Sequence, residues 1–598
     1  MAEPIERPLP SGANAPAFGS DVIAETLRAL DIPYIALNPG ASYRGLHDSL
    51  VNYLGNSAPQ MLLCLHEESA VAIAHGYAKV TGRAMAAAVH SNVGLMHATM
   101  AIFNAWCDRM PVLVLGATGP VDAVKRRPWI DWIHTARDQG ALVRPYTKWD
   151  DQPASPAAAR EALMRALWIA NTTPQGPVYV NLDAEMQEAK LPEPLPPVEA
   201  ARFMPPVASA PDAQAVAKAA ALLKGVRTAA GLLGAKNIVM LIGRVSRTEK
   251  AWNDRVTLAE SIGAQVITCL KTAASFPTDH PLHLGAPSVL TPDAEGLAAL
   301  AKADVILSLD WVDLAGTLKA AKAPADGAKV ISATIDHQIH NGWSMDHQGL
   351  APVDVMLAAD PEDAVPLLIE TIGDTDPLVV TRPAREDRDL PATTLTVEHL
   401  ARALRDTVDD RPFSLTHLPL SWNGAWWPFR HPLDFLGSDG GGGLGAGPGV
   451  TVGAALALKG AGRIPIGICG DGDFLMGATA IWTAAHYRIP LLIVVANNRS
   501  FYNDEVHQER VARMRNRPVE NKWIGQRISD PDIDLAALAR AQGALGFGPI
   551  EDVDQLAPTF AKAIAAVEQG QVAVVDVRVA PGYTPAMTAA VSNAERKA

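Results

Sequence analysis

Cysteines and long apolar runs are scarce in this sequence. Its 598 residues contain four widely spaced cysteines, which fit neither a disulfide framework nor a zinc-binding pattern: Cys64, Cys107, Cys269 and Cys469. The longest apolar run, residues 489–496, is the size of a strand and falls well short of the ~20 residues that span a bilayer. Residues 1–19 lack the apolar core of a signal peptide. These absences predict a reduced, cytoplasmic setting and no membrane partner.

An excess of basic residues is also missing. The chain carries 51 Lys and Arg against 64 Asp and Glu, a formal net charge of −13, so we expect no nucleic-acid partner. Apolar residues, in contrast, are plentiful. Hydrophobic residues make up 48% of the chain and charged residues 19%, which is the balance of a globular protein with large cores. At this length we expect about three or four domains.

Short apolar runs alternate with amphipathic stretches, which predicts an α/β fold. In the first part of the chain we expect strands at 34–37, 61–65, 84–89 and 111–115, and helices at 44–54, 67–80 and 94–106. Pro-rich stretches at 190–206 and 375–393 predict linkers. We therefore predict three doubly wound parallel-sheet domains, at 1–190, 207–373 and 394–598.

Polar side chains follow two of the expected strands in the third unit. The sequence GDGDF at 470–474 comes after a buried run, and Asn498 comes after the next one. The carboxyl ends of parallel strands meet at one sheet edge, where ligands bind. Carboxylate and amide oxygens at that edge suit Mg²⁺. An EF-hand is excluded, because its fifth and twelfth positions would be Leu475 and Trp482. An ordinary strand–helix turn stays open.

The spacing of this motif resembles the diphosphate-anchoring motif of thiamine diphosphate (ThDP) enzymes, GDG followed by a helix, a strand and NN. The resemblance implies Mg²⁺ held by Asp471, Asn498 and the main-chain carbonyl of Ser500. It also implies contacts to the cofactor from Gly472, Asp473 and Asn498. The order of three α/β units is similar to the pyrimidine-binding, middle and diphosphate-binding domains of the benzoylformate decarboxylase and acetolactate synthase group. This likeness covers nearly the whole chain.

The first unit contains HEESA at 66–70, followed by GYAKVTG at 76–82. The pair resembles the segment of these enzymes that carries the cofactor-activating glutamate. The family spacing, nine positions before the glycine of GYA, selects Glu67 over Glu68. The implied role is a hydrogen bond to N1′ of the cofactor pyrimidine, from a dry pocket. The simpler interpretation is an acid at a helix start, favoured by the helix dipole.

Two histidines occupy positions that resemble benzoylformate decarboxylase. His90, in VHSNVG, ends a predicted strand, and His280 lies in FPTDHP. A histidine beside the reacting centre could exchange protons with intermediates, so both are predicted catalytic residues. Each could instead be structural. The turn NPGAS at 38–42 departs from the family's NPGS, because Ala41 stands where the carboxylate-binding serine would be. This departure leaves the substrate open.

The sequence GGGLG at 441–445 is similar to the stretch that bends the bound cofactor. Leu444 would wedge between the two rings, and the Gly442 carbonyl would accept from the 4′-amino group. Ser421 is the expected hydroxyl near the diphosphate. A dinucleotide fingerprint is the weak alternative, since no clean buried strand precedes these glycines. The aromatic cluster at 422–429 could line a pocket or form core, and the Arg-rich segment after Phe501 could be a lid or a solvated surface.

The resemblance implies a ThDP- and Mg²⁺-dependent non-oxidative decarboxylase of a 2-oxo acid that works through an enamine. The alternative is a carboligase or carbon–carbon lyase of the acetolactate synthase or 2-hydroxyacyl type. A third possibility is a protein that binds the cofactor without turnover, which Glu67 argues against. Because the glutamate of one subunit serves the cofactor of another in this family, a homodimer or homotetramer is implied. Whether the middle domain holds FAD or another nucleotide stays open.

Overall fold

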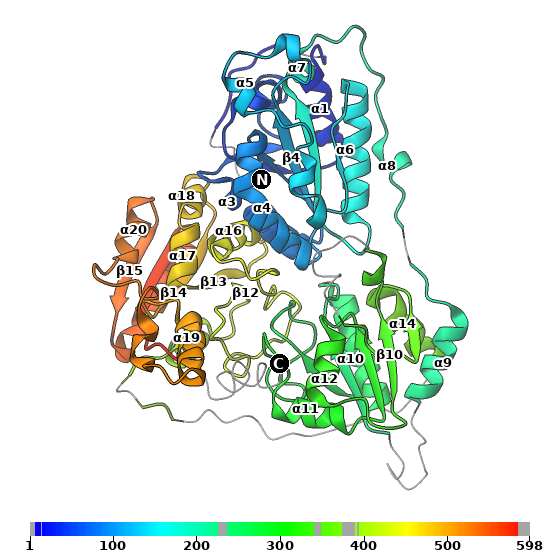
Figure 1. The fold of residues 1–598 in the computed structure, drawn as a ribbon, viewed down its shortest axis with the longest axis vertical. Helices are drawn as coiled ribbons and strands as arrows, with labels where there is room; N and C mark the ends of the chain where they lie inside the picture. The colour runs from blue at the N-terminus through cyan, green and yellow to red at the C-terminus, as the bar shows by residue number, and fades with distance from the viewer. Residues whose placement is uncertain are drawn as a thin grey trace.

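The structure, a computed structural model, describes residues 6–12, 15–207, 209–224, 236–339, 349–373, 389–391 and 394–583. The chain forms three lobes, each built on one parallel sheet: the first at the top of Figure 1, the middle one at the lower right and the third at the left. The predicted fold class is therefore confirmed. Among the described residues, no helix has both the length and the apolar character needed to cross a membrane.

The first sheet has the strand order β2-β1-β3-β4-β6-β5. Its strands are β1 (Tyr34–Leu37), β2 (Gln60–Leu63), β3 (Met85–Val89), β4 (Val112–Thr118), β5 (Asp150–Asp151) and β6 (Val178–Asp183). The helices are α1 (Gly19–Ala29), α2 (Arg44–Asp48), α3 (Glu67–Thr81), α4 (Ser91–Cys107), α5 (Ile130–Ile133), α6 (Pro156–Asn171) and α7 (Ala184–Glu188). A short helix, α8 (Ala200–Phe203), lies inside the first predicted linker.

The middle sheet has the order β11-β10-β9-β7-β8. Its strands are β7 (Ile238–Ile242), β8 (Gln265–Thr268), β9 (Val305–Leu309), β10 (Lys329–Ala333) and β11 (Val355–Leu357). The helices are α9 (Ala213–Leu223), α10 (Glu249–Ile262), α11 (Ala294–Ala301), α12 (Leu314–Ala321) and α14 (Pro361–Ile372). Most of the second predicted linker lies outside the described residues, and the domain boundaries stay predictions.

The third sheet has the order β12-β13-β14-β16-β15. Its strands are β12 (Phe413–His417), β13 (Ile464–Gly470), β14 (Leu491–Asn497), β15 (Leu545–Ile550) and β16 (Val572–Arg578). The helices are α15 (Val397–Val408), α16 (Ala446–Ala457), α17 (Asp471–Gly477), α18 (Ala480–His486), α19 (Tyr502–Met514), α20 (Leu535–Ala541) and α21 (Leu556–Glu568).

Burial explains why these segments are strands. Every residue of β14 is buried, and so is all of β13 up to its last glycine, as in a parallel sheet covered on both faces. Two helix predictions need correction. The helix predicted at 94–106 begins at Ser91, and the helix predicted after the acidic turn begins at Asp471 itself. The second shift has a physical reason, since a carboxylate in a first turn interacts favourably with the helix dipole.

The first and third domains meet through two helices that touch backbone to backbone. A Cβ added at Gly76 of α3 would lie 2.1 Å from the carbonyl oxygen of Val450 on α16. A Cβ added at Gly453 of α16 would lie 1.9 Å from the carbonyl oxygen of Ile73 on α3. Neither glycine has a left-handed backbone, so close approach of the helices is what requires them.

Replacing Gly453 by Ala should weaken this helix pair. The added methyl has only backbone to meet, so it should cost about 1–3 kcal/mol, more than the helix propensity of Ala returns. We expect a lower Tm in scanning calorimetry. The matched control is Gly349→Ala, whose Cβ would come no nearer than 3.5 Å to the Ala315 Cβ. An unchanged Tm for Gly453→Ala would contradict this packing.

Candidate active site

The side chains of two predicted metal ligands, Asp471 and Asn498, meet at the carboxyl ends of β13 and β14. The Ser500 amide donates to Asp471 Oδ2 at 3.1 Å and to Asn498 Oδ1 at 2.9 Å. The Gly472 amide donates to Asp471 Oδ1 at 2.9 Å. Burial raises the pKa of Asp471 to about 6, although these amides act in the opposite direction. The structure thus brings a desolvated carboxylate and an amide oxygen to one point.

Asp473, two residues after Asp471, accepts hydrogen bonds from the glycine-rich segment. Its Oδ1 accepts from the Gly445 amide at 2.7 Å and the Gly447 amide at 3.3 Å. Its Oδ2 lies 3.2 Å from His417 Nε2 at the end of β12. Burial alone would raise the pKa of Asp473, but His417 and the two amides bring it below the usual value. The side chain therefore holds the start of α16. The predicted contact of Asp473 with the cofactor stays a prediction.

The segment that precedes α16 is also held from the first domain. Asn104 of α4 is buried, and its Oδ1 accepts from the amides of Gly441 (3.1 Å) and Gly443 (3.3 Å). The Lys79 ammonium on α3 donates to the Ser438 carbonyl. The sequence analysis missed Asn104, which no motif marks, and it gave Lys79 no role although Lys79 lies in the GYAKVTG segment. Within this segment Gly442 has a left-handed backbone, φ +71°, which favours glycine, and Leu444 is 44% exposed.

Glu67 is the first residue of α3, and its side chain is 7% exposed. Its Oε2 lies 3.2 Å from Nδ1 of His97 on α4. A Cβ at Gly94, one turn before His97, would lie 2.7 Å from Glu67 Oε1, so the carboxylate occupies the space that Gly94 leaves. The His66 ring stacks on the His97 ring, with centroids 5.1 Å apart. The sequence analysis missed His97.

Glu68 faces a different way from its neighbour. A Cβ at Gly445 would lie 3.7 Å from Glu68 Oε1. Burial, and then the charge of Asp473, raise the pKa of the Glu68 carboxyl. Inside one chain, therefore, Glu68 faces the glycine segment of the third domain, whereas Glu67 faces the first turns of α4.

His90 lies at the corner between β3 and α4. Its Nδ1 is 2.9 Å from the Ser42 hydroxyl, and its ring centroid is 4.6 Å from that of His134. A Cβ at Gly40 would lie 2.3 Å from the His90 ring, so the NPG turn leaves room for it. The next residue, Ser91, has φ +41°, the type of backbone strain that gathers at functional sites. Burial, and then His134, lower the pKa of His90.

Three other expectations have mixed outcomes. His280 Nε2 lies 3.3 Å from Glu260 on α10, so the structure gives it a partner within the middle domain, and its catalytic role stays a prediction. Ser421 lies in the segment after β12, and its contact with the diphosphate also stays a prediction. The aromatic cluster is core: the rings of Trp422, Trp426, Trp427 and Phe429 are buried with α15. Of the two alternatives, pocket wall or core, the structure has core, because these rings pack in the hydrophobic cluster of the third domain.

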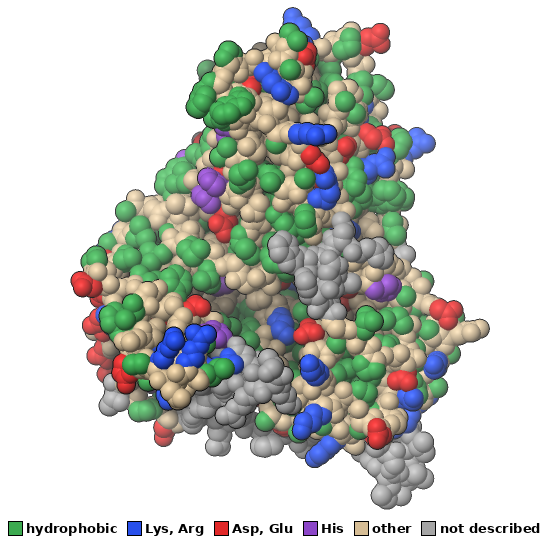
Figure 2. All heavy atoms as spheres, viewed as in Figure 1, with side chains coloured by type: hydrophobic (Ala, Val, Ile, Leu, Met, Phe, Trp, Pro, Cys, Tyr) green, Lys and Arg blue, Asp and Glu red, His purple; other side chains and the backbone are tan. Residues whose placement is uncertain are grey.

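The Arg-rich segment after Phe501 forms α19, which lies at the surface. Figure 2 shows Lys and Arg side chains gathered at the lower left, where Figure 1 places α19. One acid is an exception, because Glu505 is buried and its Oε1 accepts from the Ser500 hydroxyl at 2.6 Å. Glu505 thereby attaches the helix to Ser500, which lies two residues after Asn498. This arrangement supports a solvated surface, anchored at the predicted metal end.

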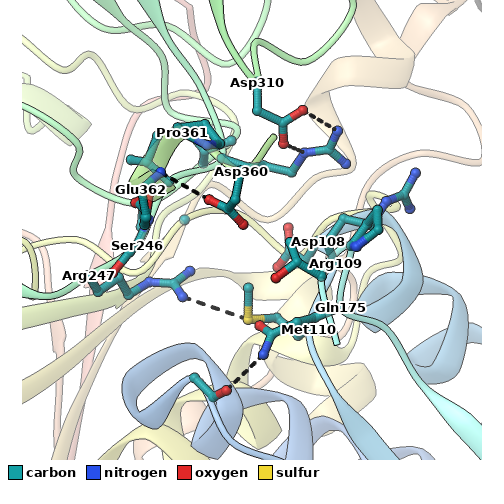
Figure 3. A pocket seen from close by; sticks show the side chains of 18 of the residues that line it. Asp108, Arg109, Met110, Gln175, Ser246, Arg247, Asp310, Asp360, Pro361 and Glu362 are labelled. Carbon is teal, nitrogen blue, oxygen red and sulfur yellow. Dashed lines mark hydrogen bonds and ion pairs between the residues drawn. The ribbon is translucent and has the colours of Figure 1, made fainter. Parts of the chain in front are cut away.

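A cavity of about 520 Å³ lies between the first and middle domains. Figure 3 shows Asp310 at the top, Asp360 near the centre, Arg247 at the left and Arg109 at the right. The lining charges largely pair with one another: Arg244 meets Asp310 at 3.0 Å, and Arg109 meets Asp336 at 2.5 Å. Neither Glu67 nor Asp471 lines this cavity.

The residues at the third sheet fit the cofactor that the sequence resemblance implies. Asp471 is a buried carboxylate, and Asn498 adds a second hard oxygen beside it. At Gly470 an added Cβ would meet nothing within 4 Å, so the backbone is open to a ligand there. The same donor set would suit Mg²⁺ and the diphosphate that it carries.

Comparison with known families gives matches along most of the chain. Residues 18–142 match the N-terminal TPP binding domain of thiamine pyrophosphate enzymes, residues 226–366 their central domain, and residues 420–577 their C-terminal TPP binding domain. The three matches follow the order of the three sheets.

Individual relatives are similar over most of their length. A "Probable acetolactate synthase large subunit" of Methanocaldococcus jannaschii is 24% identical, over 88% of this chain and 86% of that protein. A "Benzoylformate decarboxylase" of Pseudomonas aeruginosa is 26% identical, over 74% and 79% respectively. Among solved structures, the 4-hydroxybenzoylformate decarboxylase of Rhodococcus jostii aligns with a TM-score of 0.75 at 23% identity, over 95% of this chain and 100% of that one, a likeness of fold.

The matched domains, their order and the relatives agree with the site geometry. The chain belongs to the thiamine pyrophosphate enzymes, in the group that contains benzoylformate decarboxylases and acetolactate synthases, and it is a ThDP-dependent carbon–carbon lyase or carboligase.

Proposed function

We propose that this enzyme removes CO₂ from a 2-oxo acid without oxidation and releases an aldehyde, using ThDP and Mg²⁺. The observation that carries the proposal is His90, at a strained corner and with a lowered pKa. Decarboxylation leaves a carbon that must receive a proton. Because Ser42 occupies Nδ1 of His90, Nε2 is the atom left to deliver that proton.

The remaining groups of the site would orient and activate the cofactor. ThDP, when bound, supplies a carbon nucleophile and an electron sink. Glu67, in its buried position, would exchange a proton with N1′ of the pyrimidine. Leu444 and the Gly442 carbonyl would fix the bent shape, on a segment that Asn104 and Asp473 hold in place. Such holding is preorganisation, because the segment need not order itself when the substrate arrives.

A carboligase reaction is the second candidate. The relatives include acetolactate synthases as well as decarboxylases, and both reactions begin with the same attack on a 2-oxo acid. The two reactions differ in what the carbon nucleophile then reacts with: a proton in a decarboxylase, or a second carbonyl compound in a carboligase. His90 supports the proton as acceptor, and this favours decarboxylation.

We also propose that the active site forms between two copies of the chain. Glu67 faces α4, where Met96 is 53% exposed. Helix α17, which begins at Asp471, carries Met476, which is 59% exposed. Figure 2 shows hydrophobic side chains across the region of α17 and α18. Each chain thus has two half-sites, and each half-site is flanked by exposed apolar side chains. This arrangement suits a two-fold dimer in which the Glu67 half-site of one copy meets the metal half-site of the other.

The first test is a panel of aliphatic and aromatic 2-oxo acids with ThDP and Mg²⁺. We expect CO₂ release without an added acceptor aldehyde. His90→Ala should lower kcat by about 10²–10⁴-fold, because it removes a general acid. The control is His431→Ala, at a histidine that pairs with Glu249 outside the site. Product only in the presence of a second carbonyl compound would instead establish the carboligase.

Metal affinity should depend on the protonation of Asp471. Since Mg²⁺ binds the ionised form and burial raises the pKa to about 6, affinity should be level above pH 7 and fall about tenfold per pH unit below pH 6. Titration of the ThDP-free protein with Mn²⁺, followed by electron paramagnetic resonance, measures this. Asp471→Asn should abolish binding, and Asp406→Asn, at an exposed helix position, should not. Equal affinity at pH 7 and pH 5 would refute Asp471 as a ligand.

Mixing two inactive variants tests the shared site. Glu67→Gln and Asp471→Asn should each be inactive alone. Refolded or co-expressed together, they should regain about one quarter of wild-type activity, because half of the dimers are hybrids and each hybrid has one intact site. If a single chain carried the whole site, the mixture would stay inactive. Sedimentation of the wild type should show a dimer or tetramer.

A further inference from the structure

His134 lies against the ring of His90, at the carboxyl edge of the first sheet. Strands β1, β3 and β4 are neighbours in that sheet, so the turns that follow them share one edge. The His134 carbonyl accepts from the amide of Gly119, one residue after β4, at 3.1 Å. The ring centroids of His90 and His134 are 4.6 Å apart, and the ring planes are tilted by 55°. A residue far along the chain is thus fixed beside the proposed proton donor.

The segment that carries His134 is held by its own contacts. Asp131 of the short helix α5 is buried and accepts from the amide, Nε and Nη2 of Arg127 at 2.6, 3.2 and 2.9 Å. Trp129, the residue before α5, has φ +67°, a backbone that a bulky side chain adopts only under constraint. Strain of this kind persists where the surrounding contacts over-determine it, and it gathers at functional sites. His134 therefore has a fixed position, as a binding group requires.

The two histidines differ in what their ring nitrogens contact. His90 Nδ1 lies 2.9 Å from the hydroxyl of Ser42, which is buried. Neither ring nitrogen of His134 has a hydrogen-bond partner among the described residues. Ala41, beside Ser42, is apolar. Because Ser42 is engaged with His90, His134 is the side chain of this corner that is left to bind another group.

Buried hydroxyl groups at the same edge also lack partners. Ser91 follows His90, Thr135 follows His134, and Thr118 ends β4. The hydroxyl oxygens of these three residues have no hydrogen-bond partner among the described residues, and Ser91 and Thr118 are 0% exposed. A buried hydroxyl without a partner is costly, so native proteins pair nearly all of them. Three of them on turns that meet at one sheet edge indicate a ligand with several oxygen atoms.

The charges around His90 favour an anion as this ligand. Burial, and then His134, lower the pKa of His90, while the charge of Glu67 acts in the opposite direction. Two imidazoles in contact repel each other when both carry a proton, so an anion beside them is stabilised. Asp131, the acid on the same segment, is already paired with Arg127. The edge belongs to the Glu67 half-site, which the proposed second copy would enclose, and enclosure strengthens a charged contact.

We propose that His134 is a specificity-determining residue that binds the carboxylate of the 2-oxo acid, an inference that rests on the proposed function. The His134 imidazole donates to one carboxylate oxygen, and the unpartnered hydroxyls at the same edge are donors for the other. Because His90 lies against His134, an acid held in this way has its reacting carbon near the proposed proton donor. The site selects a 2-oxo acid over an aldehyde or ketone of similar shape, since only the acid carries the anion.

Binding of unreactive acids tests this assignment apart from turnover. Mandelate and lactate carry the carboxylate of a 2-oxo acid but no keto carbon, and mandelamide and lactamide are their uncharged counterparts. In calorimetric titration of the enzyme loaded with ThDP and Mg²⁺, at least one acid should bind more tightly than its amide. His134→Phe keeps a ring against His90 and should weaken that acid about 10- to 100-fold, with no change for the amide. His134→Arg keeps a donor and should stay within a few fold of the wild type.

Wild-type affinity of His134→Phe for the acid would show that His134 only packs against His90, and would overturn the assignment. Acids that bind the wild type no better than their amides would overturn it too, as would His134→Arg binding as weakly as His134→Phe. His134→Leu repeats the measurement if His134→Phe does not fold. The control is His431→Phe, at a histidine that pairs with Glu249, which should bind the acid as the wild type does.

The CO₂ assay separates this site from the proposed function. With a 2-oxo acid as substrate, His134→Phe should mainly raise KM, whereas His90→Ala should mainly lower kcat. If acid binding depends on His134 while no 2-oxo acid releases CO₂, the proposed decarboxylation fails and the carboxylate site stands. If CO₂ is released and His134→Phe leaves both KM and acid binding unchanged, the decarboxylation stands and the role of His134 fails.

Discussion

The backbone contact between α3 and α16 is the constraint on which the site depends. Gly76 and Gly453 let two helices from different domains approach very closely. At either position, any side chain larger than hydrogen would collide with a carbonyl oxygen of the other helix. Helix packing normally keeps axes 8–10 Å apart, and small residues permit the lower end of that range. This contact fixes the first domain against the third. The contact also gives a physical reason for Gly76, the glycine of GYA, which in the sequence served only to show a family resemblance.

Close docking of these domains lets each supply groups to the other's loops. Lys79 and Asn104, from the first domain, bind the glycine segment of the third, and Asp473 binds the same segment from within its own domain. A segment with so many glycines would lose much conformational entropy on ordering. Hydrogen bonds to these side chains, which are charge-assisted for Lys79 and Asp473, offset that loss, and each would be costly to break because its partner would be left unsatisfied. These hydrogen bonds therefore hold the glycine segment in one conformation, although a glycine-rich segment without them would be flexible.

The same docking separates the roles of two adjacent acids. Successive residues on a helix point about 100° apart, so Glu67 and Glu68 cannot face the same neighbour. Glu68 faces the third domain of its own chain, and Glu67 faces α4 and His97. This divergence is what the proposed shared site requires, because Glu67 does not face the third domain of its own chain. The exposed apolar side chains beside each half give a physical reason for a second copy to cover them.

The sequence alone determined the fold class, the order of the three domains and the residues at the strand ends, because these depend on local patterns. The cofactor came from the resemblance of its motifs to those of ThDP enzymes. Apolar runs of strand length define the sheets, and GDG with Asn498 lies where strands 13 and 14 of the chain end. It could not assign Asn104, Lys79, His97 or the true partner of Asp473. Their roles come from contacts between residues that are 28 to 359 positions apart. The tertiary structure also decided that the aromatic cluster is core and that the helix begins at Asp471. Local patterns set which residues can meet at a sheet edge, whereas only the packing of helices against one another sets which side chains do.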